Sequence, residues 1–425
     1  MPELILIILV VSLLCLGTPI AFVLGIPAAA YIWLSGHNIT TVPSRIYEGV
    51  DNFVLIAIPL FFLLGETMNR VGLSDKLMRF VNLFVGRLRG GLAQANVVSS
   101  IIFSGMTGTG VGDVAAIGSV FIPAMKKAGY PLNFSAAVTA AAAVIGPTIP
   151  PSVVMVIYGY VVGVSIGGLF IAGVIPGLLI GLGCMVINYI YARRNNFPKS
   201  AERATIKEYS RVTLQAFPSL LTPLIIIGGM VTGFFTPTEA AAIAAAWAFL
   251  LGILYRTLHL DNFYSSIVES AIKSSMVMLI IALSSVMAWI FAVMGLTPRI
   301  IDLIHSISMN KEVVLFMMLV FVLIMGCFLD IAVIIILFGP ILAPVAHGMG
   351  INPLHFGITM VVGVNIGMIT PPMGTCLFAS CAVAKITLED LVRAIWPYII
   401  VEIGVLLLVA YSETLALFLP RMFGF

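Results

Sequence analysis

The sequence carries very little charge: only 9% of its 425 residues are Asp, Glu, Lys or Arg. Soluble domains average about 25% charged residues. Because apolar residues make up 61% of the chain, a folded form lacks the polar surface to cover itself in water. A lipid bilayer is therefore the expected solvent. The net charge of +3 is small and dispersed, so no nucleic-acid partner is expected.

Motifs that would support an enzyme are also missing. The sequence has no Walker A motif, which argues against ATP as the direct energy source. It has no Gly-x-Ser-x-Gly, no His-Glu-x-x-His and no paired aspartates of an intramembrane protease. The five cysteines show neither zinc nor redox spacing, and we interpret them as small buried hydrophobic residues. The sequence thus predicts a protein that is not an enzyme.

Long apolar runs predict membrane helices, since a spanning helix needs about 20 apolar residues. Uninterrupted runs cover residues 3–17, 20–35, 52–70, 167–192, 214–232, 238–257, 265–294 and 395–418. Four further stretches are interrupted, at 91–127, 133–160, 313–347 and 354–384. Two of them, 91–127 and 313–347, break at 104–110 and near 326–330. We interpret these two as helical hairpins that enter the membrane and return.

Basic residues set the orientation, because cytoplasmic loops are enriched in Lys and Arg. The region 193–211 contains six of them and is therefore expected in the cytoplasm. Lys or Arg residues also flank the first hairpin at both ends, so both of these ends are expected in the cytoplasm. Counting crossings from 193–211 places the ends of the second hairpin outside. The two hairpins should thus enter from opposite faces.

An internal repeat accounts for this arrangement. Residues 146–152 resemble residues 367–373 at an offset of 221, and other Gly and Pro residues match at nearly the same offset. We predict an all-α polytopic membrane protein built from two inverted repeats, 1–195 and 212–425, joined by a cytoplasmic linker at 196–211. Each repeat would hold an amphipathic arm, a re-entrant hairpin and a broken helix. Inverted repeats around broken helices are typical of secondary transporters.

The two broken helices are candidate cation sites. Each places Pro-Pro inside an apolar stretch, and proline leaves backbone carbonyls unpaired. Such carbonyls persist at membrane depth only where another group satisfies them. Hard cations prefer oxygen ligands, and Thr148 and Thr370 add hydroxyls beside the breaks. A simple proline kink is the alternative interpretation.

Two isolated acidic residues lie at membrane depth, where ionisable groups are costly and usually functional. Asp330, beside the second hairpin turn, is interpreted as functional. For Asp113, at the start of a returning helix, an N-cap role is an equal alternative. Because Lys and Arg are nearly absent from 90–192 and 313–384, an anionic solute is expected to meet helix N-termini, hydroxyls and bound cations.

At this point the sequence resembles a known family. Residues 103–119, 122–125, 129–130 and 140–152 look like the large membrane subunit of tripartite ATP-independent periplasmic (TRAP) transporters. Residues 235–241 are similar to a second signature of that family. The resemblance covers nearly the whole chain. One departure is the hairpin turn at 106–112, where a shorter run rich in Ser and Ala is expected.

The resemblance implies an elevator-type transporter in the bacterial inner membrane that imports organic acids such as C4-dicarboxylates or sialic acids with Na⁺. It implies two partners, a small four-helix membrane subunit and a periplasmic solute-binding protein, and arms at 73–86 and 297–309 that brace a scaffold. One Na⁺ site would use Ser104, Thr107, Gly146, Thr148 and Pro150. The other would use Gly326, Asp330, Gly367, Thr370 and Pro372. Candidate contacts to the organic acid are Thr109, Asp113, Ser152, Met373 and Gly374.

Three other interpretations remain open. The nearest is a stand-alone Na⁺/organic-anion symporter of the same superfamily that needs no binding protein. A channel would require a continuous polar path, which the low charge between residues 90 and 192 disfavours. A purely structural membrane protein would give no reason for two matching Pro-Pro breaks.

Overall fold

The computed structural model describes residues 2–197 and 205–425, apart from the side chains of residues 105–107, 297 and 305. Every regular element in this part of the chain is a helix. Seven helical segments within it are long and apolar enough to cross a membrane, including Phe53–Arg70 and Leu260–Val293. The expected polytopic all-α architecture is therefore confirmed.

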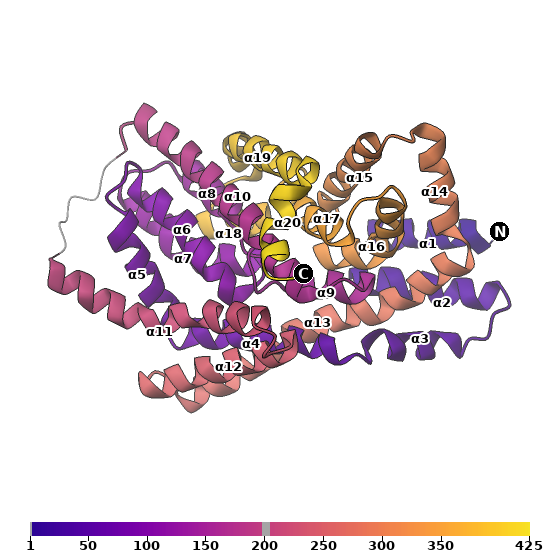
Figure 1. Cartoon of the computed structure of the whole chain (residues 1–425), viewed down its shortest axis with the longest axis horizontal. Coiled ribbons are helices and arrows are strands. Elements are labelled where there is room, and N and C mark those ends of the chain that lie inside the picture. The colour runs from indigo at the N-terminus through magenta and orange to yellow at the C-terminus, as the bar shows by residue number, and fades with distance from the viewer. Residues whose placement is uncertain (1, 198–204) are drawn as a thin grey trace.

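For description we divide the helices into two bodies, which contact each other through α5 and α6 and through α13 and α16 (Figure 1). In the first body, α4 packs against α12 and α13, and α13 also packs against α2 and α3. Helices from both halves of the chain are thus interleaved in one layer. This body consists of α1 (Pro2–Cys15), α2 (Ile20–Leu34), α3 (Thr41–Val50), η1 (Phe53–Ile56), α4 (Ala57–Arg70), α5 (Leu73–Val85), α11 (Ile206–Val231), α12 (Pro237–Leu254), α13 (Leu260–Val293) and α14 (Leu296–Ile307).

The second body holds both hairpins and both broken helices. Here α18 packs against α7, α19 against α8, α9 against α16, and α15 against α17, so the two halves are again interleaved. Its helices are α6 (Gly91–Thr107), α7 (Gly110–Lys127), α8 (Leu132–Ala142), α9 (Val153–Val162), α10 (Ile166–Arg194), α15 (Lys311–Gly326), α16 (Ile331–Gly348), α17 (Pro353–Gly367), α18 (Thr375–Ala384), α19 (Leu388–Tyr411) and α20 (Glu413–Met422).

The two broken helices share their local geometry. The irregular residues between α8 and α9 and between α17 and α18 each contain a cis Pro-Pro peptide bond. Both second half-helices end at a left-handed residue, Gly163 with φ 78° and Lys385 with φ 56°. The following helices are capped by the hydroxyls of Ser165 and Thr387. These equivalences agree with a repeat, whose boundaries at 1–195 and 212–425 stay a prediction.

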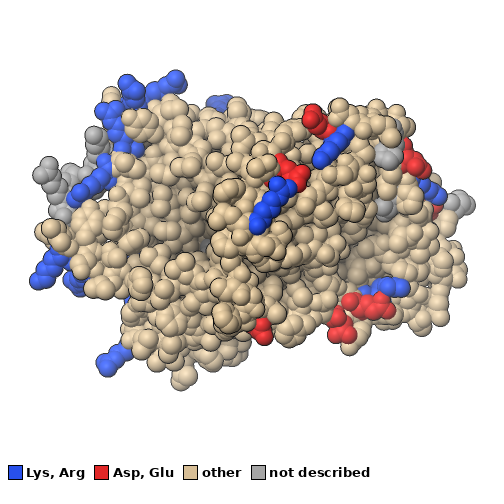
Figure 2. Space-filling model, in the orientation of Figure 1, with Lys and Arg blue, Asp and Glu red and all other residues tan. Residues whose placement is uncertain are grey.

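The arms α5 and α14 occupy opposite ends of the molecule (Figure 1). Each begins directly after a glycine in the left-handed region, Gly72 with φ 71° and Gly295 with φ 62°. Lys and Arg side chains gather at the end where α10 stops and α11 begins (Figure 2). By the positive-inside rule this end is expected to face the cytoplasm. The arm α5 lies at this end, and α14 lies at the other.

Three local details differ from what the sequence suggested. The first hairpin does not break across 104–110, because α6 continues to Thr107 and only Gly108 and Thr109 separate it from α7. The expected linker 196–211 is partly helical, because α11 starts at Ile206 with the hydroxyl of Thr205 as its cap. The short amphipathic helix α3 was not anticipated, because its polar composition hid it between two apolar runs.

Candidate functional site

The first hairpin meets the first broken helix at its tip. Gly108, at the tip, has a φ of 61°, a conformation that glycine adopts without steric cost. A methyl group built on Gly108 would lie 3.0 Å from the carbonyl oxygen of Pro151 and 3.3 Å from the amide nitrogen of Val153. The tip therefore lies against the start of α9, which brings Thr109 close to this break.

The predicted residues of the first break are buried together. The Ser104 hydroxyl donates to the carbonyl of Ile101 at 2.6 Å. The Thr148 hydroxyl donates to the carbonyl of Val144 at 2.7 Å. Pro150 is also buried, whereas the side chain of Thr107 lies outside the described residues. The two hydroxyls described here, those of Ser104 and Thr148, are both fully buried.

Asp113 belongs to this cluster. A methyl group built on Gly146 would lie only 2.0 Å from Asp113 Oδ2, so the carboxylate is packed directly against the break. The N-cap interpretation of Asp113 is wrong, because α7 begins at Gly110 and Thr109 occupies its N-cap position. The structure thus places a buried carboxylate in the first turn of α7, beside Gly146 of the first break.

The second hairpin meets the second broken helix through backbone contact. A methyl group built on Gly326 would lie 2.8 Å from the Cα of Gly367. The Thr370 hydroxyl donates to the carbonyl of Ile366 at 2.8 Å. Gly374 is packed against the carbonyl of Met368. Glycine at both contact points lets the two backbones touch.

Three predicted residues of the second half are more open. Asp330 is exposed and caps α16, where its Oδ1 accepts from the amide of Ala332 at 2.9 Å. Pro372 is exposed, and Met373 is 54% exposed. In contrast, Ser152 of the first half is fully buried, donates to the carbonyl of Pro147 at 2.6 Å and caps α9. The predicted contacts to the organic acid are therefore in unlike surroundings.

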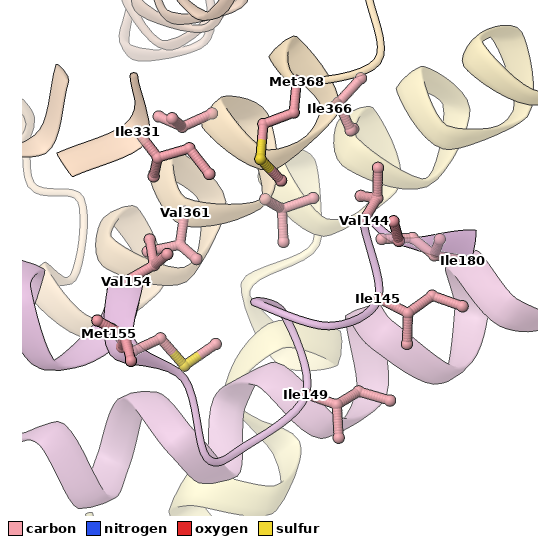
Figure 3. Close-up of a cluster of buried hydrophobic side chains, with 14 of the residues drawn as sticks. Val144, Ile145, Ile149, Val154, Met155, Ile180, Ile331, Val361, Ile366 and Met368 are labelled. Atoms are coloured by element: carbon pink, nitrogen blue, oxygen red, sulfur yellow. The ribbon is translucent and has the colours of Figure 1, made fainter. Parts of the chain in front are cut away.

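The two breaks adjoin each other. The side-chain amide of Asn365, at the end of α17, donates to the Thr148 hydroxyl at 3.0 Å. Apolar residues of both breaks, among them Ile145 and Met368, belong to one buried cluster (Figure 3). The first break is thus in direct contact with the end of α17, where the second break begins. Asn365 was missed, and the available signal was an isolated amide within an apolar run.

A cavity of about 620 Å³ separates the first hairpin from the first body. Its charged walls are Glu66, Asp75 and Lys273, and Thr109 and Ser119 line it from the hairpin side. It is also lined by Ser74, Asp75 and Met78 of α5, the arm at the end of the molecule where Lys and Arg side chains gather (Figure 2). The sequence analysis missed Lys273, because it lies within a long apolar segment outside the hairpins.

One carboxylate was also missed, that of Glu402 in the middle of α19. It is fully buried, and its Oε1 lies 3.7 Å from Cys184 Sγ. One turn earlier, the hydroxyl of Tyr398 donates to the side chain of Asn188 at 2.6 Å. Glu402 carried the same signal as Asp113, an isolated acidic residue in an apolar run, and should have been noted.

The amino-acid sequence is similar to those of known proteins. The model of the tripartite ATP-independent periplasmic transporter, DctM component, matches residues 6–415. The chain belongs to the DctM family. It is 37% identical to the sialic acid TRAP transporter large permease protein SiaM of Vibrio cholerae, over 97% of both chains. It is also 37% identical to the C4-dicarboxylate TRAP transporter large permease protein DctM of Pseudomonas aeruginosa, over 94% of each chain.

A solved structure shows the same fold. The YdaH transporter of Alcanivorax borkumensis superimposes with a TM-score of 0.62, over 87% of this chain and 86% of that one. At 15% identity this likeness concerns the fold alone. As a DctM-family protein, the chain is a multi-pass membrane component of a TRAP transporter.

Proposed function

We propose that this DctM-family chain is the large permease subunit of a Na⁺-coupled importer of an organic acid in the bacterial inner membrane. The observation that carries the proposal is that each hairpin tip contacts a broken helix, and that the Asn365–Thr148 hydrogen bond joins the two breaks into one centre. A carrier needs such a centre, because substrate and coupling ion must bind near the membrane midplane.

Two Na⁺ sites are proposed, one at each break. The first would draw on Gly146, Thr148 and Pro150 together with Ser104 and Thr107, and the carboxylate of Asp113 adjoins it. The second would draw on Gly326, Gly367, Thr370 and Pro372, with Asp330 at the hairpin turn. Among the described residues, no group of three or more His, Cys, Asp or Glu could hold a metal ion. Carbonyl and hydroxyl oxygens suit Na⁺, which is also a hard cation.

The organic-acid class follows from the relatives, one named for sialic acid and one for C4-dicarboxylates. Both solutes carry carboxylates. Half-helices α9 and α18 begin just after the breaks, and each N-terminus carries a partial charge of roughly +0.5. A bound Na⁺ would supply further positive charge close to a carboxylate. Thr109, Ser152, Met373 and Gly374 are proposed as neighbours of the solute.

The proposed movement is an elevator-type displacement of the second body against the first. The cavity between α7 and the first body is the space through which the hairpin would move. Asp75 of α5 and Ser119 of α7 both line it and are both exposed. Cysteines at these two positions, bridged by a bifunctional thiol reagent that spans the cavity, should stop uptake. Normal uptake by the bridged protein would contradict the movement.

The proposed partners are a small four-helix membrane subunit and a periplasmic solute-binding protein. The deciding experiment is uptake into proteoliposomes that contain the chain with its co-purified membrane partner, with a panel of binding proteins and an imposed Na⁺ gradient. Uptake that requires both Na⁺ and one binding protein supports the proposal. Uptake by the chain alone would favour the stand-alone symporter, and uptake without Na⁺ dependence would overturn Na⁺ coupling.

A further inference from the structure

The cavity between α7 and the first body lies toward the end expected to face the cytoplasm, and its wall contains a lysine in an ion pair. Lys273 of α13 donates from its ammonium group to the Glu66 carboxylate of α4, and both side chains line the cavity. The side chain of Lys273 is 45% exposed, whereas that of Glu66 is 16% exposed. The ammonium group is thus the more accessible member of the pair.

Glu66 has a second cationic neighbour. Arg70 Nε lies 3.9 Å from Glu66 Oε2, and the guanidinium also lies 3.9 Å from Glu269 Oε1. If Lys273 moved to another carboxylate, Glu66 would keep a positive charge beside it. Lys273 can therefore exchange one carboxylate for another without leaving a buried charge unpaired. An unpaired buried charge is the costly outcome in such networks.

The opposite wall of the cavity belongs to the first hairpin. Thr109 at its tip and Ser119 along α7 face the same space as Lys273. A volume of about 620 Å³ is within the usual range for small-molecule sites, about 300–1,000 Å³. A solute that leaves the hairpin tip toward the cytoplasm would enter this space and meet Lys273 there.

We propose that Lys273 receives the carboxylate of the organic acid on its way to the cytoplasm, and that Glu66 competes with that carboxylate for the same ammonium group. This inference rests on the proposed function. An ammonium group is a compact point charge that does not require a planar, bidentate partner. Lys273 would thus accept carboxylates of different shapes, and its partial exposure keeps the interaction weak enough for release.

An ion pair that merely joins α4 to α13 predicts a different result. In that case, removal of either partner would shift the half-saturating concentration in the same direction. Reversing the charges of the pair would restore the wild-type value. Competition predicts opposite effects. Lys273→Gln removes the receiving group, whereas Glu66→Gln removes its competitor and frees the ammonium group for the solute.

The test uses proteoliposomes of known orientation that hold the chain with its membrane partner, with labelled succinate or N-acetylneuraminate supplied at the cytoplasmic face. Lys273→Gln should raise the half-saturating concentration at that face about two- to five-fold, the range for partly exposed ion pairs. Glu66→Gln should lower it, and Lys273→Arg should retain most of the wild-type value. Both effects should shrink at high salt.

The controls separate this inference from the proposed function. Lys76→Gln removes a lysine of α5 that stacks on the Tyr255 ring outside the cavity lining, and should leave cytoplasmic half-saturation unchanged. The reversed pair, Glu66→Lys with Lys273→Glu, should not restore the wild-type value. Na⁺-driven uptake could be normal while the cytoplasmic half-saturating concentrations of both single variants stay unchanged or shift in the same direction. That result would overturn this inference alone. Absence of Na⁺-driven uptake from every protein, wild type included, would overturn the proposed function.

Discussion

The two breaks share a backbone pattern but differ in how far the rest of the chain covers them. Residues 143–152 of the first break are all buried, whereas Pro372 and Met373 of the second are exposed. The first is covered by the hairpin tip and Asp113, and the second touches its hairpin through two glycines. The repeated sequence thus gives both breaks the same backbone path, but the residues that surround each break differ. The proposed first cation site would be enclosed by this chain, and the second would be more open.

The largest expected effect concerns the contact between Gly326 and Gly367. An added methyl group would meet backbone at either position, which cannot move aside. Gly326→Ala or Gly367→Ala should therefore separate the second hairpin from its break, lower the free energy of unfolding by about 1–3 kcal/mol and reduce uptake at least about ten-fold. Thermal unfolding in detergent and initial uptake rates would measure this.

The matched substitutions sharpen the comparison between the halves. Gly146→Ala would meet the Asp113 carboxylate, a side chain that can shift, so its structural cost should be smaller than that of Gly326→Ala. Gly228→Ala, in α11, meets nothing within 4 Å and should behave as wild type. A larger loss of stability in Gly146→Ala than in Gly326→Ala would contradict the proposed difference.

An intermediate effect is expected at the two threonines. Thr148→Val removes the acceptor of the buried Asn365 amide and should cost about 1–3 kcal/mol. Thr370→Val removes only a half-buried donor to a helix carbonyl and should cost below about 1 kcal/mol. Both variants should need more Na⁺ for half-maximal uptake if each hydroxyl is a ligand. Unchanged Na⁺ dependence in both would exclude the hydroxyls as ligands.

The smallest effect is expected where the two half-helices begin. Ser152 caps α9 from a buried position, so Ser152→Ala should lower the free energy of unfolding by about 0.5–2 kcal/mol. Its counterpart Met373 is exposed and makes no cap, so Met373→Ala should stay within about 0.5 kcal/mol of wild type. Equal losses would mean that the second break is covered in the functional protein.

Much of the fold could be predicted because apolar runs and Pro-Pro breaks are local signals. The expected segments 20–35 and 167–192 correspond closely to α2 and α10, and the amphipathic arms were placed within about two residues. The turn at 104–110 was misjudged because glycine and hydroxyl residues are tolerated inside membrane helices. There α6 continues through 104–107, and the left-handed conformation of Gly108 makes the turn.

The site could be predicted only in part, because its partners are distant in the sequence. The breaks and hairpin tips were found from composition, and the structure brings them together. Asn365 and Thr148 are 217 positions apart, and no local pattern signals their contact. Lys273 and Glu66 are 207 positions apart and lie outside the hairpins and broken helices in which the sites were predicted.

The hydrogen bond between Asn365 and Thr148 has a consequence for ion binding. Thr148 belongs to the proposed first Na⁺ site, and Asn365 precedes Gly367 of the second site by two residues. A cation that draws on the Thr148 hydroxyl would alter its bond to Asn365, and a rearrangement at Gly367 would act back through the same bond. Occupancy of the two sites would then be linked by one coupling free energy that acts equally in both directions. Na⁺ titrations of uptake should be sigmoidal, and Asn365→Leu should lower their Hill coefficient toward one.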